Sequence, residues 1–366
     1  MIQDRAQKAQ ALRYIVSKRW FPQLEVNVLP KVAMGHVNKP LTDIDMLALI
    51  PDEFDGFRLL IVDCKTRKGE SPISRALWQR GLMDQLHATR GICIFKRNRI
   101  ESDHRYSAAQ FGVLLLTEEE FETYTKATGD QRNLSVGNVA NIDLWQKFSE
   151  IPAKYPILTP AIQYSMYGHW MNRDDSEACR KSLTQASRLN RELDPAKATH
   201  MAIVADLVSL FMQALAKIVM QVFASYLQPS NRGELSDALL ILLYGGRDSY
   251  DRINKLQKLI RTSDQDAHSH RELTLPNWDQ FLQLIRHCLD APVEVSKSPL
   301  LVRELAWSYL SGEDNLDFAK ILAAESPQAA KLSLLGAEYL CRAAKLPSEF
   351  GTNLSKVLLD IQQPPY

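Results

Sequence analysis

Charged residues stand at the end of the most apolar strand that this sequence predicts, within the stretch 41–68. The strand expected over 57–65 runs through the apolar sequence LLIV and then ends on Asp63, Cys64 and Lys65. A continuous apolar run is typical of a strand that is buried on both faces. Because side chains alternate along a strand, Asp63 and Lys65 share one face. Burying charge is costly unless the charge is paired or bound to a metal, so this ending indicates an ion pair or a functional site.

A further acidic residue opens the preceding strand, which we expect over 45–50. Asp45 stands at its start, and a hairpin-like turn separates this strand from the one that ends in Asp63. Asp43 shares the face of Asp45 if the strand begins early. In that case Asp43 either supports Asp45 or binds a second ion.

The first 125 residues alternate between helical and strand patterns. A capping box at Thr117 and Glu120 marks the start of the last helix in this part. The order of elements predicts an α/β domain with a mixed central sheet over residues 1–125. The expected elements are a helix over 2–19, strands over 23–34, 45–50 and 57–65, a helix over 74–90, a strand over 92–95, a polar crossover over 96–110, a strand over 112–116 and a helix from 117.

A polar stretch over 126–141, with two glycines and little periodicity, indicates a linker. Beyond it the sequence has no convincing alternating strand, and Pro and Gly separate a series of helical windows. We therefore predict an all-helical domain over 142–366, which binds substrate or a partner, or forms a dimer. The windows are 173–192, 196–227, 234–244, 250–262, 277–290, 298–311, 315–324, 327–345 and 352–362.

Composition indicates the class of protein rather than its activity. Apolar residues make up 45% of the chain and charged residues 24%, as in ordinary soluble domains, and the net charge of +1 gives no hint of a nucleic-acid partner, so any such signal must be local. The five cysteines are widely spaced and odd in number, which favours a reducing compartment over a disulfide framework or a zinc knuckle. The first residues lack the apolar core of a secretory signal, so we expect a cytoplasmic protein.

One apolar segment, over 201–227, is long enough to raise the question of a membrane span. Its polar residues follow one narrow stripe of a helix, and a lysine near the middle of a span is costly. We therefore expect a buried helix of a soluble domain and no membrane partner. The stripe consists of Asp206, Gln213, Lys217 and Gln221.

The N-terminal part resembles the PD-(D/E)xK nuclease superfamily, whose restriction-endonuclease-like fold occurs in many restriction enzymes and Holliday-junction resolvases. The matching pieces are Asp45 at the head of an apolar strand, the sequence IVDCK over 61–65, and the helix and buried strand that follow. The similarity covers residues 1–125. It implies a metal-dependent endodeoxyribonuclease that hydrolyses phosphodiester bonds, for example in a defence or mobile-element system.

The resemblance also implies roles for individual residues. Asp45 and Asp63 would ligate a divalent cation, Mg²⁺ or Mn²⁺, and the backbone carbonyl of Cys64 would be a further ligand. Lys65 would lie beside the attacking water. Such a ligand set is chemically sufficient, because magnesium keeps several waters and needs only one or two carboxylates with phosphate oxygens.

The sequence departs from the superfamily pattern at two places. Ile44 stands where a Pro often precedes the first Asp, which is a common variation. The first helix has no Glu, although many members use one there as a further ligand. Asp4 or Gln7 could face the site in its place, and the sequence does not establish that either completes it.

The region after Lys65 indicates a nucleic-acid surface beside the site. Gln79, on the helix expected over 74–90, is our first choice for a polar catalytic residue there. Basic residues outnumber acidic ones across this region, as a polyanion-binding surface requires, and a solvated basic face gives the same pattern. The positions predicted to contact nucleic acid are Arg67, Lys68, Arg75 and Arg80.

Other kinds of protein fit the same residues. A non-catalytic nucleic-acid-binding or assembly subunit could keep the fold; the missing helix Glu favours this alternative, whereas Asp45, Asp63 and Lys65 favour catalysis. The helical domain could also be a protein-interaction module with the nuclease as its effector. Asp63 and Lys65 could form a simple salt bridge at a strand end, and RNA is an alternative to DNA as the substrate.

Overall fold

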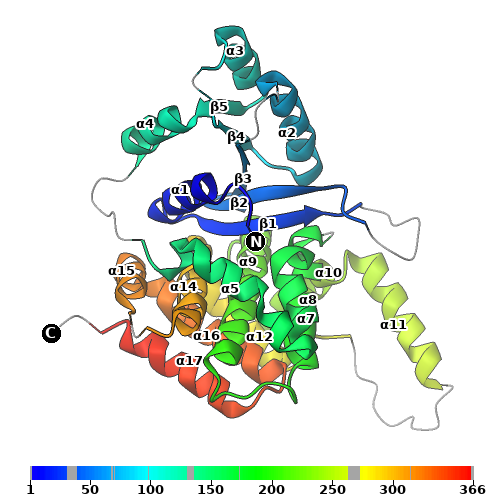
Figure 1. The fold of residues 1–366 in the computed structure, drawn as a ribbon. Coiled ribbons are helices and arrows are strands. Elements are labelled where there is room, and N and C mark those ends of the chain that lie inside the picture. The colour runs from blue at the N-terminus through cyan, green and yellow to red at the C-terminus, as the bar shows by residue number, and fades with distance from the viewer. Residues whose placement is uncertain are drawn as a thin grey trace.

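The computed structural model describes residues 2–30, 39–66, 69, 71–97, 99–129, 136–172, 174–262, 273–313 and 315–363. A five-stranded mixed sheet occupies the N-terminal part, and the rest of the chain is mostly helical (Figure 1). This confirms the predicted layout of an α/β part followed by a helical part.

The sheet has the strand order β1-β2-β3-β4-β5. The first three strands pair antiparallel, and β3, β4 and β5 pair parallel, so the predicted mixed sheet is confirmed. The predicted capping box is also present, with Thr117 and Glu120 exchanging hydrogen bonds at the start of α4. The elements are α1 (Arg5–Ser17), β1 (Phe21–Val28), β2 (Thr42–Asp52), β3 (Gly56–Lys65), α2 (Pro72–Leu86), β4 (Arg90–Phe95), α3 (Ser102–Gln110), β5 (Val113–Thr117) and α4 (Glu118–Thr128).

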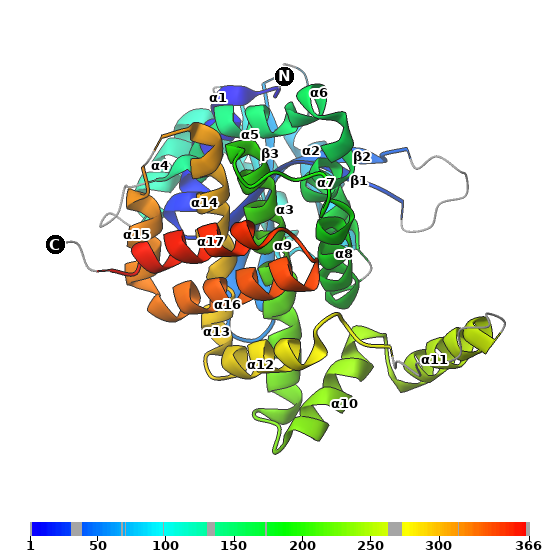
Figure 2. The ribbon, with the colours of Figure 1, turned by 90° about the horizontal axis from the view of Figure 1, so that it is seen from below.

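The helical part begins earlier than the predicted windows, because a series of short helices fills residues 138–171. Helix α11 extends away from the rest of this part (Figure 2). The elements are η1 (Asn138–Ala140), α5 (Ile142–Ser149), α6 (Ile151–Lys154), η2 (Pro156–Leu158), α7 (Thr159–Gln163), η3 (Tyr164–Gly168), η4 (His169–Met171), α8 (Asp175–Arg188), α9 (Ala198–Tyr226), α10 (Arg232–Leu243), α11 (Arg247–Thr262), α12 (Trp278–Leu289), α13 (Pro292–Val295), α14 (Ser298–Ser311), α15 (Asp317–Glu325), α16 (Pro327–Ala343) and α17 (Ser348–Asp360).

The sheet and the helical part share one hydrophobic core. One face of the sheet, with Met46 and Val62, belongs to a continuous buried cluster that includes α1, α9 and α14. The other face packs against α2 and α3 in a second cluster. The β2–β3 turn also contacts α9: Gly56 has φ +77°, and a Cβ there would lie 3.4 Å from Met220. The predicted linker over 126–141 therefore marks a change of architecture along the chain but no break in packing.

Helix α9 is the buried helix expected from its polar stripe. It is long and apolar enough to cross a membrane by length and composition alone, but 94% of its most apolar window is buried inside the fold. Three of the four stripe residues form polar pairs with other elements, and Gln221 is exposed. The pairs are Asp206 with Arg303, Gln213 with His169 and Lys217 with Asp175.

His169 makes the helical part sensitive to acid. The ring lies between Tyr164, 3.0 Å from Nδ1, and Gln213, 2.6 Å from Nε2, and burial lowers the pKa of His169 to about 3. The unfolded chain takes up a proton near pH 6.5 and the folded chain does not, so stability falls as the pH drops below 6.5. We expect the folded protein to lose about 2 kcal/mol between pH 7 and pH 5 through this residue. Urea unfolding at both pH values should show this loss reduced in His169→Gln; equal losses in both proteins would contradict it.

Candidate functional site

The register of the sheet brings the predicted acidic residues together. Met46 of β2 pairs with Val62 of β3, and the same antiparallel register places Asp45 opposite Asp63. The Asp45 side chain also binds the backbone of the neighbouring strand, because its Oδ2 accepts a hydrogen bond from the backbone N–H of Cys64 at 2.7 Å. Asp45 is only 4% exposed and Asp63 only 2%. The strand ends thus hold both carboxylates in fixed, buried positions.

Lys65 joins the two carboxylates, as the sequence predicted. Its Nζ lies 3.3 Å from Oδ1 of Asp63 and 3.9 Å from Oδ2 of Asp45. Its side chain is one-fifth exposed, whereas both acids are buried. The lysine therefore lies between the buried acids and solvent.

Arg75 of α2 is also part of this cluster. Its guanidinium binds Asp63 at both oxygens, with Nε 2.7 Å from Oδ2 and Nη2 2.5 Å from Oδ1. It also stacks on Trp78, with 3.4 Å between its central carbon and the ring centroid. The sequence predicted Arg75 as a nucleic-acid contact, but it did not predict this two-bond pairing with Asp63.

Lys8 of α1 and Glu25 of β1 extend the cluster on the side of Asp45. Lys8 is 1% exposed, and its Nζ lies 2.8 Å from Oδ1 of Asp45 and also binds Glu25. Glu25 has φ +54°, an uncommon conformation for a residue other than Gly, at the strand position opposite Asp45. Neither residue was predicted from the sequence, and Lys8 lies among the buried residues of α1.

Burial governs the electrostatics of the cluster. It raises the pKa of the Asp63 carboxyl, although the cations Arg75 and Lys65 counter this. It also raises the pKa of Glu25, against the effect of Lys8. The thiol of Cys64 is fully buried and its pKa is raised well above the ordinary value, so this cysteine is an inert side chain. Cys64 contributes to the cluster through its backbone.

Other predicted residues lie outside this contact network. Gln79 is fully buried, and its Nε2 donates to the carbonyls of Ile61 at 2.8 Å and Ile92 at 3.3 Å. These bonds tie α2 to β3 and β4, and they account for its burial without catalysis. Asp43 is exposed at the start of β2. Arg80 is exposed and pairs with Asp84 on the same helix.

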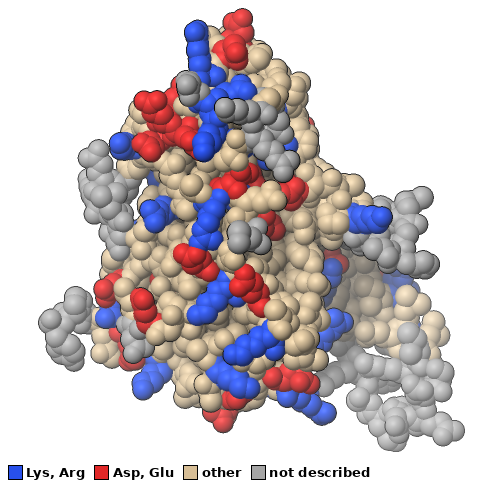
Figure 3. All heavy atoms as spheres, viewed as in Figure 1, with Lys and Arg blue, Asp and Glu red and all other residues tan. Residues whose placement is uncertain are grey.

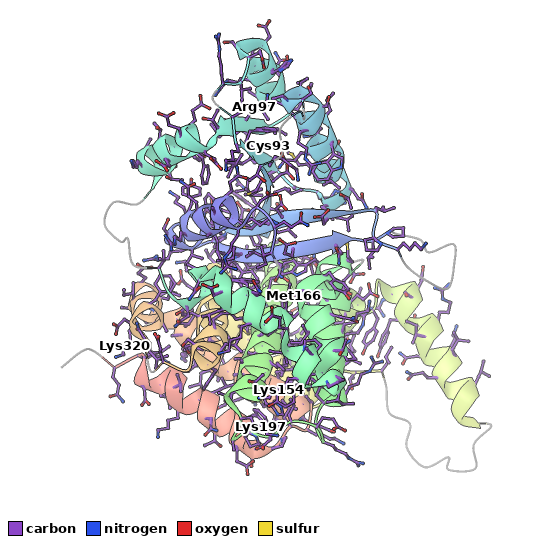
Figure 4. The ribbon with its side chains drawn as sticks, viewed as in Figure 1. Cys93, Arg97, Lys154, Met166, Lys197 and Lys320 are labelled. Carbon is purple, nitrogen blue, oxygen red and sulfur yellow. The ribbon has the colours of Figure 1, made fainter. Side chains whose placement is uncertain are left out.

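Two of the positions predicted to contact nucleic acid cannot be placed, and Cys93 is a core residue beside Gln79. Arg67 and Lys68 lie outside the described residues. Cys93 of β4, labelled in Figure 4, is a buried thiol that donates to the side chain of Gln79. Its position between the sheet and α2 makes it a residue of the second core cluster.

The first helix offers two polar residues near the end of β3. Asp4 binds the hydroxyl of Thr66, the residue that follows Lys65 in the chain. Gln7 is 1% exposed; its Nε2 donates to Glu118 at 2.8 Å and lies 3.5 Å from the Lys65 carbonyl. Its Oε1 has no hydrogen-bond partner among the described residues. Gln7 therefore presents a buried, unsatisfied oxygen beside the site.

The donor atoms suit a hard divalent cation in kind. Within the described part of the chain, no group of three or more His, Cys, Asp or Glu side chains is arranged to hold a metal. Asp45 and Asp63 supply two carboxylates, which is enough for magnesium with its waters, and Gln7 Oε1 is an oxygen to which no described residue donates a hydrogen bond. One feature opposes metal binding: both oxygens of Asp63 already accept hydrogen bonds from Arg75.

The face of the molecule shown in Figure 3 gives no further indication of a polyanion partner. On this face, basic and acidic side chains of the described residues are interspersed and do not form a patch of one sign.

Comparison of the chain with protein-family models, with curated proteins and with solved structures gives no match. Fold and site define a protein with an α/β part and a helical part, which carries a buried cluster of acids and bases where β2 begins and β3 ends. The function is therefore inferred from the residues of this chain alone.

Proposed function

We propose that this chain is a metal-dependent endodeoxyribonuclease with a PD-(D/E)xK-like catalytic domain of the restriction-endonuclease-like type. The observation that carries the proposal is the meeting of Asp45, Asp63 and Lys65 at the ends of two neighbouring strands. The helical part serves substrate or partner binding, or dimerisation. A dimer would supply the second site that cutting both DNA strands requires.

Each residue has a definite task in this proposal. Asp45 and Asp63 hold a magnesium or manganese ion through their oxygens, with the Cys64 carbonyl as a further ligand. When bound, the ion polarises the scissile phosphate and lowers the pKa of its water. Lys65 orients that water and stabilises negative charge that develops on the phosphate. The Cys64 N–H and Lys8 fix the orientation of the Asp45 carboxylate.

The proposal includes a cytoplasmic protein without a membrane partner. The burial of α9 within the fold supports this, as does the occurrence of all five cysteines as buried thiols. DNA is the proposed polyanion, and cleavage of RNA would be the alternative result of the same assay.

A second candidate function is a non-catalytic nucleic-acid-binding or assembly subunit. The pairing of every carboxylate oxygen favours it: Arg75 and Lys65 contact Asp63, while Lys8 and the Cys64 N–H bind Asp45. In such a protein the cluster would serve as an internal ionic support of the sheet.

Cleavage of supercoiled, linear and branched DNA with Mg²⁺ or Mn²⁺ tests the two candidates. We expect metal-dependent cutting by the wild type and a loss of at least about 100-fold in Asp63→Asn and in Lys65→Gln, because each removes a charge that acts on the reacting phosphate. Asp360→Asn and Lys356→Gln change the same residue types on the exposed surface of α17 and should cut like the wild type.

The opposite outcome is equally definite. If the wild type never cuts, yet retards DNA in a gel as strongly as both site variants do, the catalytic proposal fails. The binding or assembly subunit then becomes the better description.

A further inference from the structure

The ion-paired side chains that the structure describes at the candidate site balance in charge without a metal ion. Among the described side chains of the cluster, each acid pairs with at least one base, and the two kinds are equal in number. A divalent cation would therefore add two positive charges to a site whose two aspartates are almost completely buried, which is costly without compensation. The acids are Asp45, Asp63 and Glu25, and the bases are Lys8, Lys65 and Arg75.

Arg75 is the base whose position conflicts most directly with a cation. It binds both oxygens of Asp63, which are the atoms that a metal ion would need. The Lys8 side chain, which pairs with Asp45, is only 2% exposed, whereas the Arg75 side chain is 17% exposed. Arg75 can therefore leave Asp63 toward solvent more easily than Lys8 can leave Asp45.

A phosphate is a suitable second partner for this arginine. The guanidinium fork matches phosphate oxygens as well as carboxylate oxygens, and both are bound through two parallel hydrogen bonds. Trp78 stacks on the guanidinium and limits its movement to the neighbourhood of the site. A phosphate placed there also supplies the negative charge that an added cation lacks.

We propose that Arg75 exchanges Asp63 for a phosphate of the nucleic acid, so that the divalent cation and the nucleic acid bind the site cooperatively. This inference rests on the proposed function and specifies how its site is regulated. Without nucleic acid, Arg75 occupies Asp63 and the cation binds weakly. With nucleic acid, Arg75 holds a phosphate, and both oxygens of Asp63 become available to the cation.

Manganese binding tests the exchange without measuring cleavage. Mn²⁺ is titrated into the protein and free Mn²⁺ is followed by electron paramagnetic resonance, with and without short duplex DNA. We expect DNA to strengthen Mn²⁺ binding to the wild type by about tenfold or more. Arg75→Gln should bind Mn²⁺ about tenfold more tightly than the wild type without DNA, and DNA should add less to its affinity.

Matched variants separate this effect from a general change of charge. Arg58→Gln removes an arginine that pairs with the buried Asp52 at the other end of β3, with 2.6 Å between Nε and Oδ2, and should bind Mn²⁺ like the wild type. Arg75→Lys keeps the charge but loses the fork, and should lie between wild type and Arg75→Gln. Thermal unfolding of each variant checks that it is folded.

The outcomes distinguish the exchange from the proposed function. If the wild type cuts DNA but Arg75→Gln binds Mn²⁺ no more tightly than the wild type, the proposed exchange of Arg75 is wrong and the proposed nuclease function is retained. Tight Mn²⁺ binding to the wild type without DNA also overturns the exchange. If no protein binds Mn²⁺ even with DNA, both proposals fail; Asp63→Asn should bind weakly in either condition if they hold.

Discussion

Arg303→Met is expected to lower the free energy of unfolding by about 3–5 kcal/mol, because it leaves a buried carboxylate without its cation. Arg303 of α14 is 0% exposed, and its Nη2 lies 2.8 Å from Oδ1 of Asp206 on α9. Its Nη1 donates to the Pro22 carbonyl at 3.0 Å and to Gln23 at 2.8 Å, both on β1. The guanidinium also stacks on Phe21 at 4.2 Å. One side chain thus joins the sheet to two helices of the helical part.

Urea unfolding followed by circular dichroism measures this loss. Burial lowers the pKa of Arg303 and raises that of Asp206, so each charged form is costly in the core without its partner. The double variant Arg303→Met/Asp206→Leu replaces both charges by apolar groups and should recover most of the lost stability. If the single variant is as stable as the wild type, or if the double variant is worse than the single one, the pair does not stabilise the fold in this way.

The same contacts explain which parts of the fold the sequence predicts. Strands β3 and β4 are predictable because apolar runs mark them, and α9 because its polar stripe has helical spacing. Helix α3 lies in a segment that we interpreted only as a polar crossover, since Ala108 is its one buried residue among those described and no apolar stripe exists. The short helices over 151–163 were missed because each is only one or two turns long and begins with a proline in its first turn.

The joining of the two parts could not be predicted from periodicity. A linker pattern over 126–141 suggested separate domains, but Arg303 of α14 binds Pro22 and Gln23 of β1 within a shared core. Met166, labelled in Figure 4, also lies where the two parts meet. Its carbonyl is 3.4 Å from Nε2 of Gln23, although the two residues are far apart in sequence. Such contacts depend on which faces meet, and a single sequence does not encode that in its local pattern.

The candidate site was predictable where it follows strand alternation. Asp45, Asp63 and Lys65 meet as expected, because alternation and register fix their directions. Lys8 carried a signal that we did not use: it stands four residues before Leu12 and seven before Ile15, on the buried face of α1. Arg75 could not be placed in the same way, because a long, flexible side chain can reach several partners from one helix position.

Lys8→Met is expected to lower the free energy of unfolding by about 3–5 kcal/mol, since it removes the cation from a buried acid. Burial alone would lower the pKa of Lys8, but Asp45 and Glu25 outweigh this and raise it, so the lysine is charged in the fold. Its loss leaves Asp45, 4% exposed, opposite Asp63 without its nearest positive charge. Urea unfolding measures the change, and Lys356→Met, an exposed lysine of α17, is the control and should be close to the wild type.

Added Mn²⁺ gives this variant a second, more specific expectation. Removing Lys8 leaves the cluster with one excess negative charge, so a divalent cation should bind it more tightly than it binds the wild type. A ligand that binds only the folded state raises stability with its concentration, and the melting temperature of Lys8→Met should therefore rise more with Mn²⁺ than that of the wild type. The additional change Asp45→Asn should remove this rise, because it removes the carboxylate that Lys8 had neutralised. An equal rise in all three proteins would mean that the cation binds elsewhere, and that Asp45 is held by Lys8 for stability alone.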